Sequence, residues 1–184
     1  MILEAERTQL VAVDIQERLL PAMSEMRQVV ERTELIGAAT RRLDIPTTIS
    51  EQYPRGLGHT YSKVHQALGN EARIFEKMHF SCMRDPELGA HIADLREAGR
   101  NQAVIIGIET HVCVAQTALD MKAQGFEVAV IVDACSSRRK DDKLAAIERF
   151  RDHGIEIITT EMAVFEWLER AGTDDFRAMA PLIK

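Results

Sequence analysis

Short runs of β-branched residues alternate along this chain with longer segments in which apolar residues recur three and four positions apart. The short runs predict strands and the longer segments predict amphipathic helices. Gly99, Gly125 and Gly154 follow three of the expected helices directly, where left-handed helix caps are common. The expected strands are residues 9–16, 45–50, 73–78, 102–109, 126–133 and 154–159, and the expected helices are residues 24–43, 86–98, 113–124 and 141–152, with a shorter one at 62–68.

The two central strands are apolar at nearly every position, as in residues 104–108 and 128–132. A strand of this kind is buried on both faces, which is typical of a parallel sheet between two layers of helices. We therefore predict an α/β fold of the Rossmann-like type, with three α/β/α layers and a six-stranded parallel sheet. No linker, repeat or low-complexity segment interrupts the pattern, so we expect residues 1–184 to form a single domain.

Composition narrows the partners of this predicted domain. The net charge is −6, and acidic and basic residues are mixed along the whole chain, so we expect no nucleic-acid partner. No apolar run approaches the roughly 18 residues that a membrane-spanning helix needs, and the amino-terminal residues carry charges, so we expect a cytoplasmic protein without a membrane partner. The three cysteines form no CxxC pair, which disfavours disulfides and structural zinc.

Candidate chemistry lies where strands end, because ligands of open parallel sheets bind beyond the carboxyl ends of the strands. No glycine-rich nucleotide motif follows any strand, whereas "GIETHVC" places Cys113 where the next helix is expected to begin. A helix dipole and free backbone N–H groups lower a thiol pKa and stabilise an oxyanion. We therefore expect a thiol at Cys113 that is alkylated well below pH 8, unlike Cys82 and Cys135, which we interpret as structural.

Two charged residues at neighbouring strand ends strengthen this interpretation. Asp14 and Lys77 each end an apolar strand, so both are carried to the same edge as Cys113. A carboxylate beside an ammonium group stays ionised and accepts the thiol proton. Taken singly, Cys113 fits a packed core residue, Asp14 a helix cap and Lys77 a solvated strand end; His111 is an alternative general base. The coincidence of the three charged or nucleophilic residues favours catalysis.

Three motifs in this order give the chain a family resemblance: "LVAVDIQERLLPAM", "FEKMHFSCM" and "GIETHVCVAQTALDM". From residue 8 to about residue 165 the chain resembles the isochorismatase-like cysteine hydrolases. The resemblance implies Asp14 as general base, Lys77 as its orienting partner and Cys113 as nucleophile. It also implies a cis Ile108–Glu109 peptide, an oxyanion hole formed by the backbone N–H groups of Glu109 and Cys113, and a homo-oligomer that is a dimer or larger.

The chain departs from the family's nicotinamidases after the second strand, where those enzymes carry an Asp-x-His metal pair. Here the corresponding stretch holds Glu51 and Tyr53, so we expect neither a metal nor another cofactor. His59 and His65 in the same long loop remain the alternative metal ligands, although they show no evident carboxylate spacing.

These residues predict a cysteine-dependent hydrolase that cleaves the C–N bond of a small amide, carbamoyl or ureido compound through a thioester. One alternative is an isochorismatase-type vinyl-ether hydrolase, and another is a non-catalytic binding or scaffold protein that retains the fold. A phosphoacceptor domain is disfavoured, because Lys77 occupies the position of its acceptor aspartate. Residues that flank the catalytic positions are candidates for substrate contact, with ordinary packing as their alternative: Gln16, Leu19, Tyr53, Phe80, Thr110 and Val112.

Overall fold

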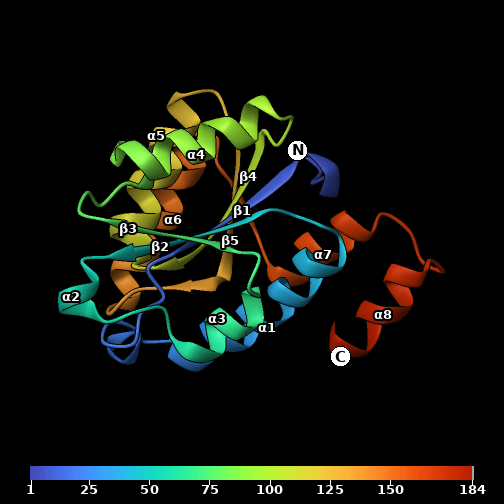
Figure 1. The fold of residues 1–184 in the computed structure, drawn as a ribbon, viewed down its shortest axis with the longest axis horizontal. Coiled ribbons are helices and arrows are strands. Elements are labelled where there is room, and N and C mark those ends of the chain that lie inside the picture. Colours follow the sequence, from blue (N-terminus) through green and yellow to red (C-terminus); the bar gives the residue numbers. More distant parts are fainter. Residues whose placement is uncertain (184) are drawn as a thin grey trace.

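All six expected strands pair side by side in one parallel sheet, in the order β3-β2-β1-β4-β5-β6. The computed structural model describes residues 1–183 (Figure 1). The predicted α/β architecture with a parallel sheet is thereby confirmed. The strands are β1 (Thr8–Val13), β2 (Thr47–Gln52), β3 (Arg73–Lys77), β4 (Gln102–Ile108), β5 (Glu127–Ser136) and β6 (Glu156–Ile158).

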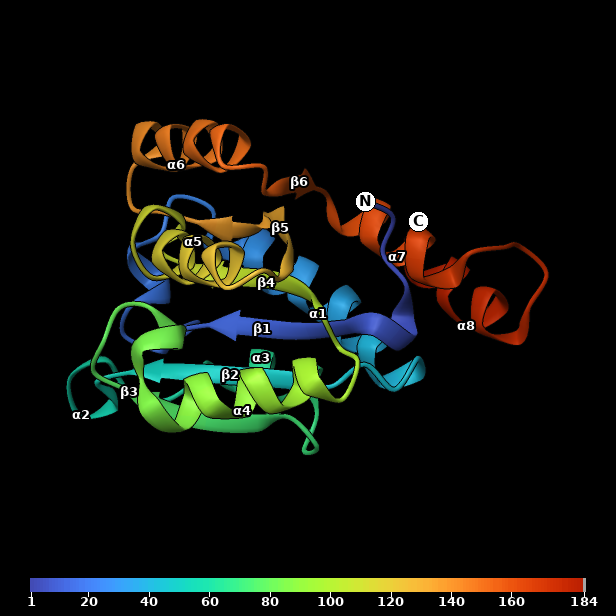
Figure 2. The ribbon, with the colours of Figure 1, turned by 90° about the horizontal axis from the view of Figure 1, so that it is seen from above.

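Helices cover both faces of this sheet. Figures 1 and 2 show α4, α5 and α6 on one face and α1, α3 and α7 on the other, with α8 set apart beside α1 and α7. The expected helix at 62–68 is present with these bounds, whereas α2, α7 and α8 were not expected from the sequence. The helices are α1 (Met26–Arg42), α2 (Pro54–Leu57), α3 (Ser62–Leu68), α4 (Pro86–Glu97), α5 (Ala115–Ala123), α6 (Lys140–Asp152), α7 (Thr160–Leu168) and α8 (Asp174–Ile183).

The alternation of side chains along β1 creates two separate cores. Leu10 and Ala12 pack in the cluster that includes α1, α3 and α7, while Val11 and Val13 pack in the cluster that includes α4, α5 and α6. Successive strand residues point to opposite faces, so a strand buried on both sides is apolar throughout. Every residue of β1 and β4 is buried, because helices cover both faces of the sheet at these two strands.

The strand order places β1 and β4 next to each other at the centre of the sheet. From β1 the chain proceeds outward to β2 and β3, and from β4 it proceeds outward in the other direction to β5 and β6. The loops that follow β1 and β4 therefore diverge, which is the arrangement that opens a crevice at the carboxyl edge of such sheets. Asp14 follows β1 and Cys113 lies shortly after β4, so both flank this point.

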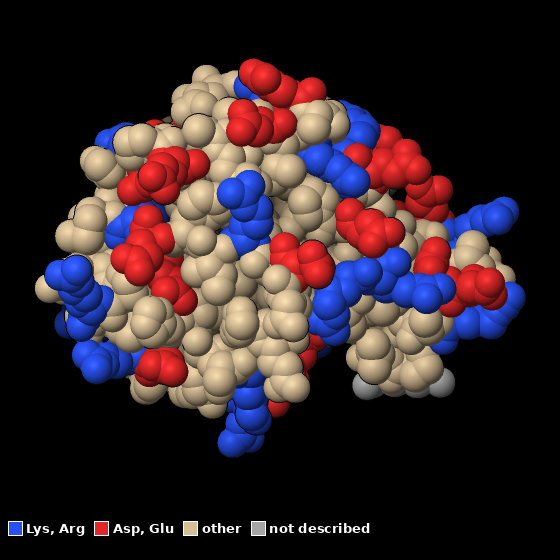
Figure 3. All heavy atoms as spheres, viewed as in Figure 1, with Lys and Arg blue, Asp and Glu red and all other residues tan. Residues whose placement is uncertain are grey.

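Acidic and basic side chains lie side by side over most of the face shown in Figure 3. This distribution agrees with the mixed charges of the sequence. No helix in residues 1–183 is long and apolar enough to cross a bilayer.

One close approach between β1 and β4 generates a test of the packing. Gly107 has φ 122°, and a Cβ atom added to it would lie 2.1 Å from the backbone oxygen of Val13. Gly107→Ala is expected to lower the free energy of unfolding by more than about 4 kcal/mol, because the obstructing atom belongs to the backbone and cannot move aside alone. Gly99→Ala is the matched control, with φ 97° and open space around the new Cβ. It is expected to cost only about 1–2 kcal/mol. Equal losses in urea unfolding of the two variants would contradict this account.

Candidate active site

Asp14 turns the chain immediately after β1. Its φ of 53° lies in the left-handed region, which Asp and Asn tolerate better than most residues. The Asp14 N–H donates to the Ser50 carbonyl at 3.1 Å, which keeps the turn attached to β2. The carboxylate is completely buried, and it accepts one hydrogen bond from Ser50 Oγ at 2.7 Å and one from Lys77 Nζ at 2.7 Å. The turn thus directs a charged group into the protein, where two donors satisfy it.

Lys77 is the last residue of β3, and its ammonium group is buried beside Asp14. The register of the sheet pairs Lys77 with Gln52 of β2, and Nζ donates to Gln52 Oε1 at 2.7 Å. An ammonium group loses its hydration on burial, so these two acceptors replace part of the lost solvation. Asp14 and Lys77 thus lie in contact at one edge of the sheet, as the sequence predicts.

Cys113 lies in a π-helical turn, Thr110–Val114, between β4 and α5. It does not begin an α-helix, which differs from the sequence-based expectation, because the turn places two further residues before α5 starts at Ala115. The Ile108–Glu109 peptide that leads into the turn is cis, as the family resemblance implies. Cys113 is 6% exposed, and its thiol is close enough to Asp14 and Lys77 that both charges shift the thiol pKa. Asp14, Lys77 and Cys113 therefore form one buried cluster.

The pKa values in this cluster correct one expectation. Burial raises the pKa of the Cys113 thiol well above its ordinary value, and the Asp14 carboxylate raises it further, while Lys77 opposes both effects. The expected low thiol pKa is therefore wrong, since desolvation outweighs the favourable charge of Lys77. Burial also raises the pKa of Asp14 despite its contacts with Lys77. Burial lowers the pKa of Lys77, but Asp14 and the two neighbouring thiols more than compensate, so its net pKa is raised and it stays charged.

These shifts describe a neutral thiol beside a carboxylate of increased basicity. A general base works best when its pKa approaches the working pH, so a raised Asp14 pKa suits the transfer of a proton from Cys113. In this arrangement, Cys113 can lose its proton to Asp14 during attack on a carbonyl carbon and need not be a thiolate beforehand.

A second buried thiol lies near the same cluster. Cys82 is fully buried, and its backbone N–H donates to Thr117 Oγ1 at 3.0 Å. Burial raises the pKa of the Cys82 thiol, and the Asp14 carboxylate raises it further. Cys135 is buried at the end of β5, and burial raises its pKa to about 12. Both are free thiols, as Cys113 is, and their interpretation as structural residues stays a prediction.

Glu109 contributes its backbone and its side chain to different neighbours. Its carbonyl accepts from the N–H groups of Val112 and Val114, at 3.0 and 3.3 Å, inside the π-helical turn. Its own N–H has no acceptor within residues 1–183, which leaves that donor available as the resemblance implies. The carboxylate accepts from the backbone N–H of Arg138 at 2.9 Å and from its Nε at 3.1 Å, so it ties the turn to the end of β5.

The six candidates for substrate contact have different surroundings. Gln16 is buried and uses its amide on backbone groups of Gln52 and Gly58, so it acts as a support. Leu19 and Val112 are half-buried and pack against the two cores. Tyr53 and Phe80 are about half exposed, at 49% and 53%. Thr110 is buried, and its Oγ1 finds no partner among the described residues, which makes it the candidate with a free polar atom. Substrate contact by all six stays a prediction.

Two further polar residues complete the cluster and were not assigned a role from the sequence. Ser50 holds Asp14, and Gln52 holds Lys77. Both lie in β2, and the pairings Val13 with Ser50 and Gln52 with Lys77 bring them there. Knowledge of the parallel register would have identified both. His111, the alternative base, instead contacts Ser137 Oγ through Nδ1 at 3.0 Å.

Glu51, near the end of β2, contacts His59 in the loop that follows the strand, but the two do not form part of a larger cluster. Glu51 Oε2 lies 2.9 Å from His59 Nδ1, and Glu51 Oε1 accepts from the Thr60 N–H at 2.6 Å and from Thr60 Oγ1 at 2.7 Å. No group of three or more metal-ligand side chains gathers within residues 1–183. Glu51 thus fastens the loop that follows β2. Burial raises its pKa, but the hydrogen bonds from Thr60 and His59 lower the pKa of Glu51 below its ordinary value.

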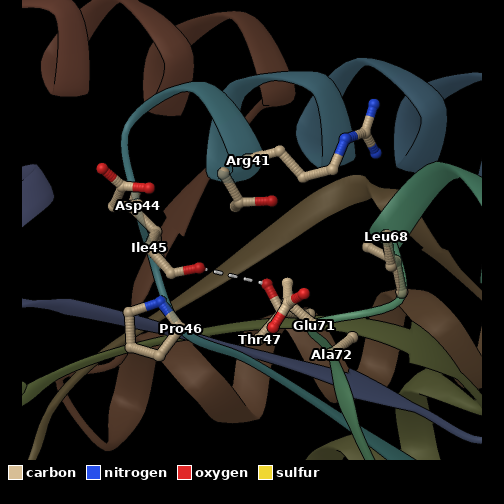
Figure 4. Close-up of a pocket in the computed structure, with 9 residues that line it drawn as sticks. Arg41, Asp44, Ile45, Pro46, Thr47, Leu68, Glu71 and Ala72 are labelled. Carbon is tan, nitrogen blue, oxygen red and sulfur yellow. Dashed lines mark hydrogen bonds between the residues drawn. The ribbon is translucent and has the colours of Figure 1, made fainter.

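Two cavities lie along β2, one near each end. A cavity of about 310 Å³ adjoins the buried cluster and is lined by Tyr53, Pro54, Arg55, Glu76, Lys77, Met78 and Asp85. Another cavity, of about 420 Å³, lies at the opposite edge between the end of α1 and the start of β2 (Figure 4). Thr47 Oγ1 donates to the Ile45 carbonyl there, at 3.3 Å. Only the first cavity contains a residue of the Asp14–Lys77–Cys113 cluster, so it is the better candidate for substrate entry.

Comparisons with known proteins agree on one family. The isochorismatase domain family matches residues 8–162. Isochorismatase domain-containing protein 1 of Danio rerio is 37% identical over 171 residues, which are 93% of this chain and only 59% of that relative. The structure of MAR1 ribonuclease from Caenorhabditis elegans is 30% identical, with a TM-score of 0.91 over 100% of this chain and 92% of that one. The Escherichia coli YcaC gene product, described as an octameric hydrolase of unknown specificity, shares the fold at 20% identity, with a TM-score of 0.91 over 100% and 89%.

The raised thiol pKa predicts how Cys113 is alkylated. Thiolate is the reactive form, so the rate with iodoacetamide is expected to be slow at pH 7 and to keep rising beyond about pH 8.5, the ordinary thiol pKa. Labelling is expected at Cys113 before Cys82 and Cys135, which are 0% exposed. Peptide mass spectrometry against time checks both points, with Cys113→Ser as control. A rate plateau below pH 8, or equal labelling of the three cysteines, would contradict the prediction.

The lowered pKa of Glu51 predicts a pH-dependent contribution to stability. Its stabilising effect is fully present above its ordinary pKa of 4.5 and is lost as the pH falls toward the lower pKa of the folded state. Glu51→Gln is expected to lower the free energy of unfolding by about 1–2 kcal/mol at pH 7, because hydrogen bonds to a charged acceptor are lost. The stabilities of the two proteins should approach each other as the pH falls through the lowered pKa of Glu51. A difference in urea unfolding that stays constant from pH 7 to pH 3.5 would be the contrary result.

Proposed function

The chain belongs to the isochorismatase family, and we propose that it is a cysteine-dependent hydrolase that cleaves the C–N bond of a small amide, carbamoyl or ureido compound. The observation that carries the proposal is the buried ion pair at the carboxyl edge of the sheet, in which Lys77 Nζ lies 2.7 Å from Asp14. The buried Cys113 thiol is close enough to both charges for them to shift its pKa. A nucleophile, a base beside it and a third group that orients the base are the parts that covalent catalysis requires.

In the acylation step, Cys113 Sγ attacks the carbonyl carbon while its proton passes to Asp14. The carbonyl double bond opens to a tetrahedral oxyanion, and the backbone N–H groups of Glu109 and Cys113 are the proposed donors to that oxygen. The free N–H of Glu109 supports this role. When the C–N bond breaks, Asp14 returns the proton to the leaving nitrogen, so ammonia or an amine departs and a thioester remains.

In the deacylation step, water attacks the thioester carbon and gives a proton to Asp14. The second tetrahedral intermediate collapses with loss of the Cys113 sulfur, which takes up the proton again as the acid product leaves. Lys77 stays charged throughout, because its pKa is raised, and it keeps the Asp14 carboxylate in place between proton transfers. The same carboxyl thus serves as base and as acid in turn.

A second candidate function is cleavage of RNA, because a C. elegans protein 30% identical over the whole chain is described as a ribonuclease. Asp14 could then take the proton of a ribose hydroxyl, with Lys77 opposite the charge that develops at phosphorus. The net charge of −6 opposes affinity for a phosphate backbone. Amide hydrolysis is therefore the better supported proposal, and RNA belongs in the substrate screen.

Assembly and location stay predictions. The E. coli protein with this fold is described as octameric, and that description applies to that protein. We expect this chain to form a homo-oligomer, a dimer or larger, and to act on its substrate in the cytoplasm.

The proposal is tested by an ammonia-release screen over primary amides, ureido acids and carbamoylated amines, with vinyl ethers and RNA assayed by their own products. For a substrate found this way, Cys113→Ser is expected to reduce kcat/KM by at least about 100-fold, because the hydroxyl is a weaker nucleophile. Asp14→Asn is expected to reduce it by about 100- to 10,000-fold, the effect of a general base.

Cys135→Ser is the matched control, since this thiol lies outside the cluster. It is expected to leave kcat/KM within about twofold of the wild type. Full amide hydrolysis by Cys113→Ser would overturn the cysteine mechanism. Vinyl-ether cleavage that requires Asp14 and Lys77 but not Cys113 would identify the chain with the other chemistry of its family.

A further inference from the structure

The Lys77 ammonium group is held by two acceptors of different charge. Asp14 Oδ2 and Gln52 Oε1 each lie 2.7 Å from Nζ, in a fully buried environment. A lysine side chain has a flexible stem and a point-like charge, so a single acceptor would leave the direction of its other N–H groups free. Two acceptors from neighbouring strands fix that direction, and the third N–H has no protein acceptor within residues 1–183.

The second acceptor carries no charge, and this matters for the thiol. Lys77 is the group that lowers the pKa of Cys113, against burial and the Asp14 carboxylate. A carboxylate at position 52 would give the ammonium group two anionic partners and leave the cluster with a net negative charge. An amide oxygen holds the ammonium group without neutralising it, so the positive field at Cys113 is retained.

Gln52 is itself fixed from three sides. Its Nε2 donates to the Met78 carbonyl at 3.0 Å, which determines that Oε1 and not Nε2 faces Lys77. Its backbone N–H donates to Gln16 Oε1 at 2.8 Å, and its carbonyl accepts from Gln16 Nε2 at 3.0 Å. Gln16 follows Asp14 by two residues, so the segment that carries the base also holds the residue that holds the lysine.

We propose that Gln52 is a positioning residue that acts through Lys77: its side-chain oxygen orients the ammonium group toward Asp14 and Cys113 and keeps the Cys113 thiol reactive. The inference deepens the proposed hydrolase function and rests on it for its catalytic meaning. Its physical content, the effect of Gln52 on the thiol, needs no substrate.

The test is a double-mutant cycle read by the rate of iodoacetamide alkylation of Cys113 at pH 8.5. Gln52→Met keeps a similar side-chain volume and removes the acceptor, and it is expected to slow alkylation three- to tenfold, since a tenfold change matches one pKa unit. Lys77→Met is expected to slow it at least tenfold. In the Lys77→Met background, the added Gln52→Met change is expected to alter the rate by less than about 1.5-fold, because a residue that acts through Lys77 has nothing left to orient.

Two further variants keep the test decisive. Gln28→Met is the matched control, since it removes an amide that donates to the Asp133 carbonyl at 3.1 Å, and it is expected to leave the rate unchanged. Gln52→Glu is the second variant in case Gln52→Met does not fold, because it keeps an oxygen acceptor for the ammonium group. The added carboxylate offsets the positive charge of Lys77. It is expected to slow alkylation by at least the same factor. Thermal unfolding of every variant accompanies the rates.

The inference is overturned if Gln52→Met slows alkylation equally with and without Lys77, which would mean a general structural role, or if neither substitution at position 52 changes the rate. Because alkylation needs no substrate, these results leave the proposed hydrolase function standing. A screen that finds no hydrolysis would reject that function and leave the role of Gln52 to be decided by the cycle.

Discussion

The contact on which the rest of the site depends is the buried ion pair between Asp14 and Lys77, with 2.7 Å between its charged atoms and no exposure of either side chain. Burying two charges is expensive, and their mutual attraction offsets the cost only when the remaining donors and acceptors are also satisfied. Ser50 and Gln52 supply those partners from the strand that lies between β1 and β3. Loss of one charge would leave the other uncompensated, at a cost of about 3–5 kcal/mol. Side-chain hydrogen bonds and the ion pair thereby join the carboxyl ends of β1, β2 and β3, in addition to the backbone hydrogen bonds of the sheet.

This ion pair also affects the protonation of the Cys113 thiol. The negative partner raises the thiol pKa, while the positive partner opposes that shift, and burial favours the neutral thiol over all. Such a thiol reacts slowly with general electrophiles in bulk solution, because little thiolate exists. In the proposed mechanism, a substrate carbonyl beside Cys113 changes this balance, since the proton moves to Asp14 as the new bond forms. Selectivity then arises from coupling proton transfer to the presence of a substrate.

The sequence allowed the sheet, its parallel order and the meeting of Asp14 with Lys77 to be predicted, because apolar alternation and strand ends are local features with global consequences. It also located α3. Other features depend on contacts between distant segments. The thiol pKa follows from burial by surrounding elements, which the position of Cys113 near a helix does not reveal. The role of Gln52 requires the register between β2 and β3. The π-helical turn at Thr110–Val114 makes α5 start two residues later than the sequence predicts. The apolar residues of α7 are visible in the sequence, but the sequence analysis did not predict a helix there.

The close contact at Gly107 links the packing of the sheet to the chemistry. Gly107 pairs with Val13, the last residue of β1, and Asp14 is the next residue in the sequence. Any side chain at position 107 would push against the Val13 backbone, so a packing change in β4 would displace Asp14, the proposed base, directly after β1. For protein engineering, the contact between β1 and β4 is therefore a part to leave unchanged, whereas the half-exposed Tyr53 lines the cavity next to Lys77 and can be substituted without touching that contact.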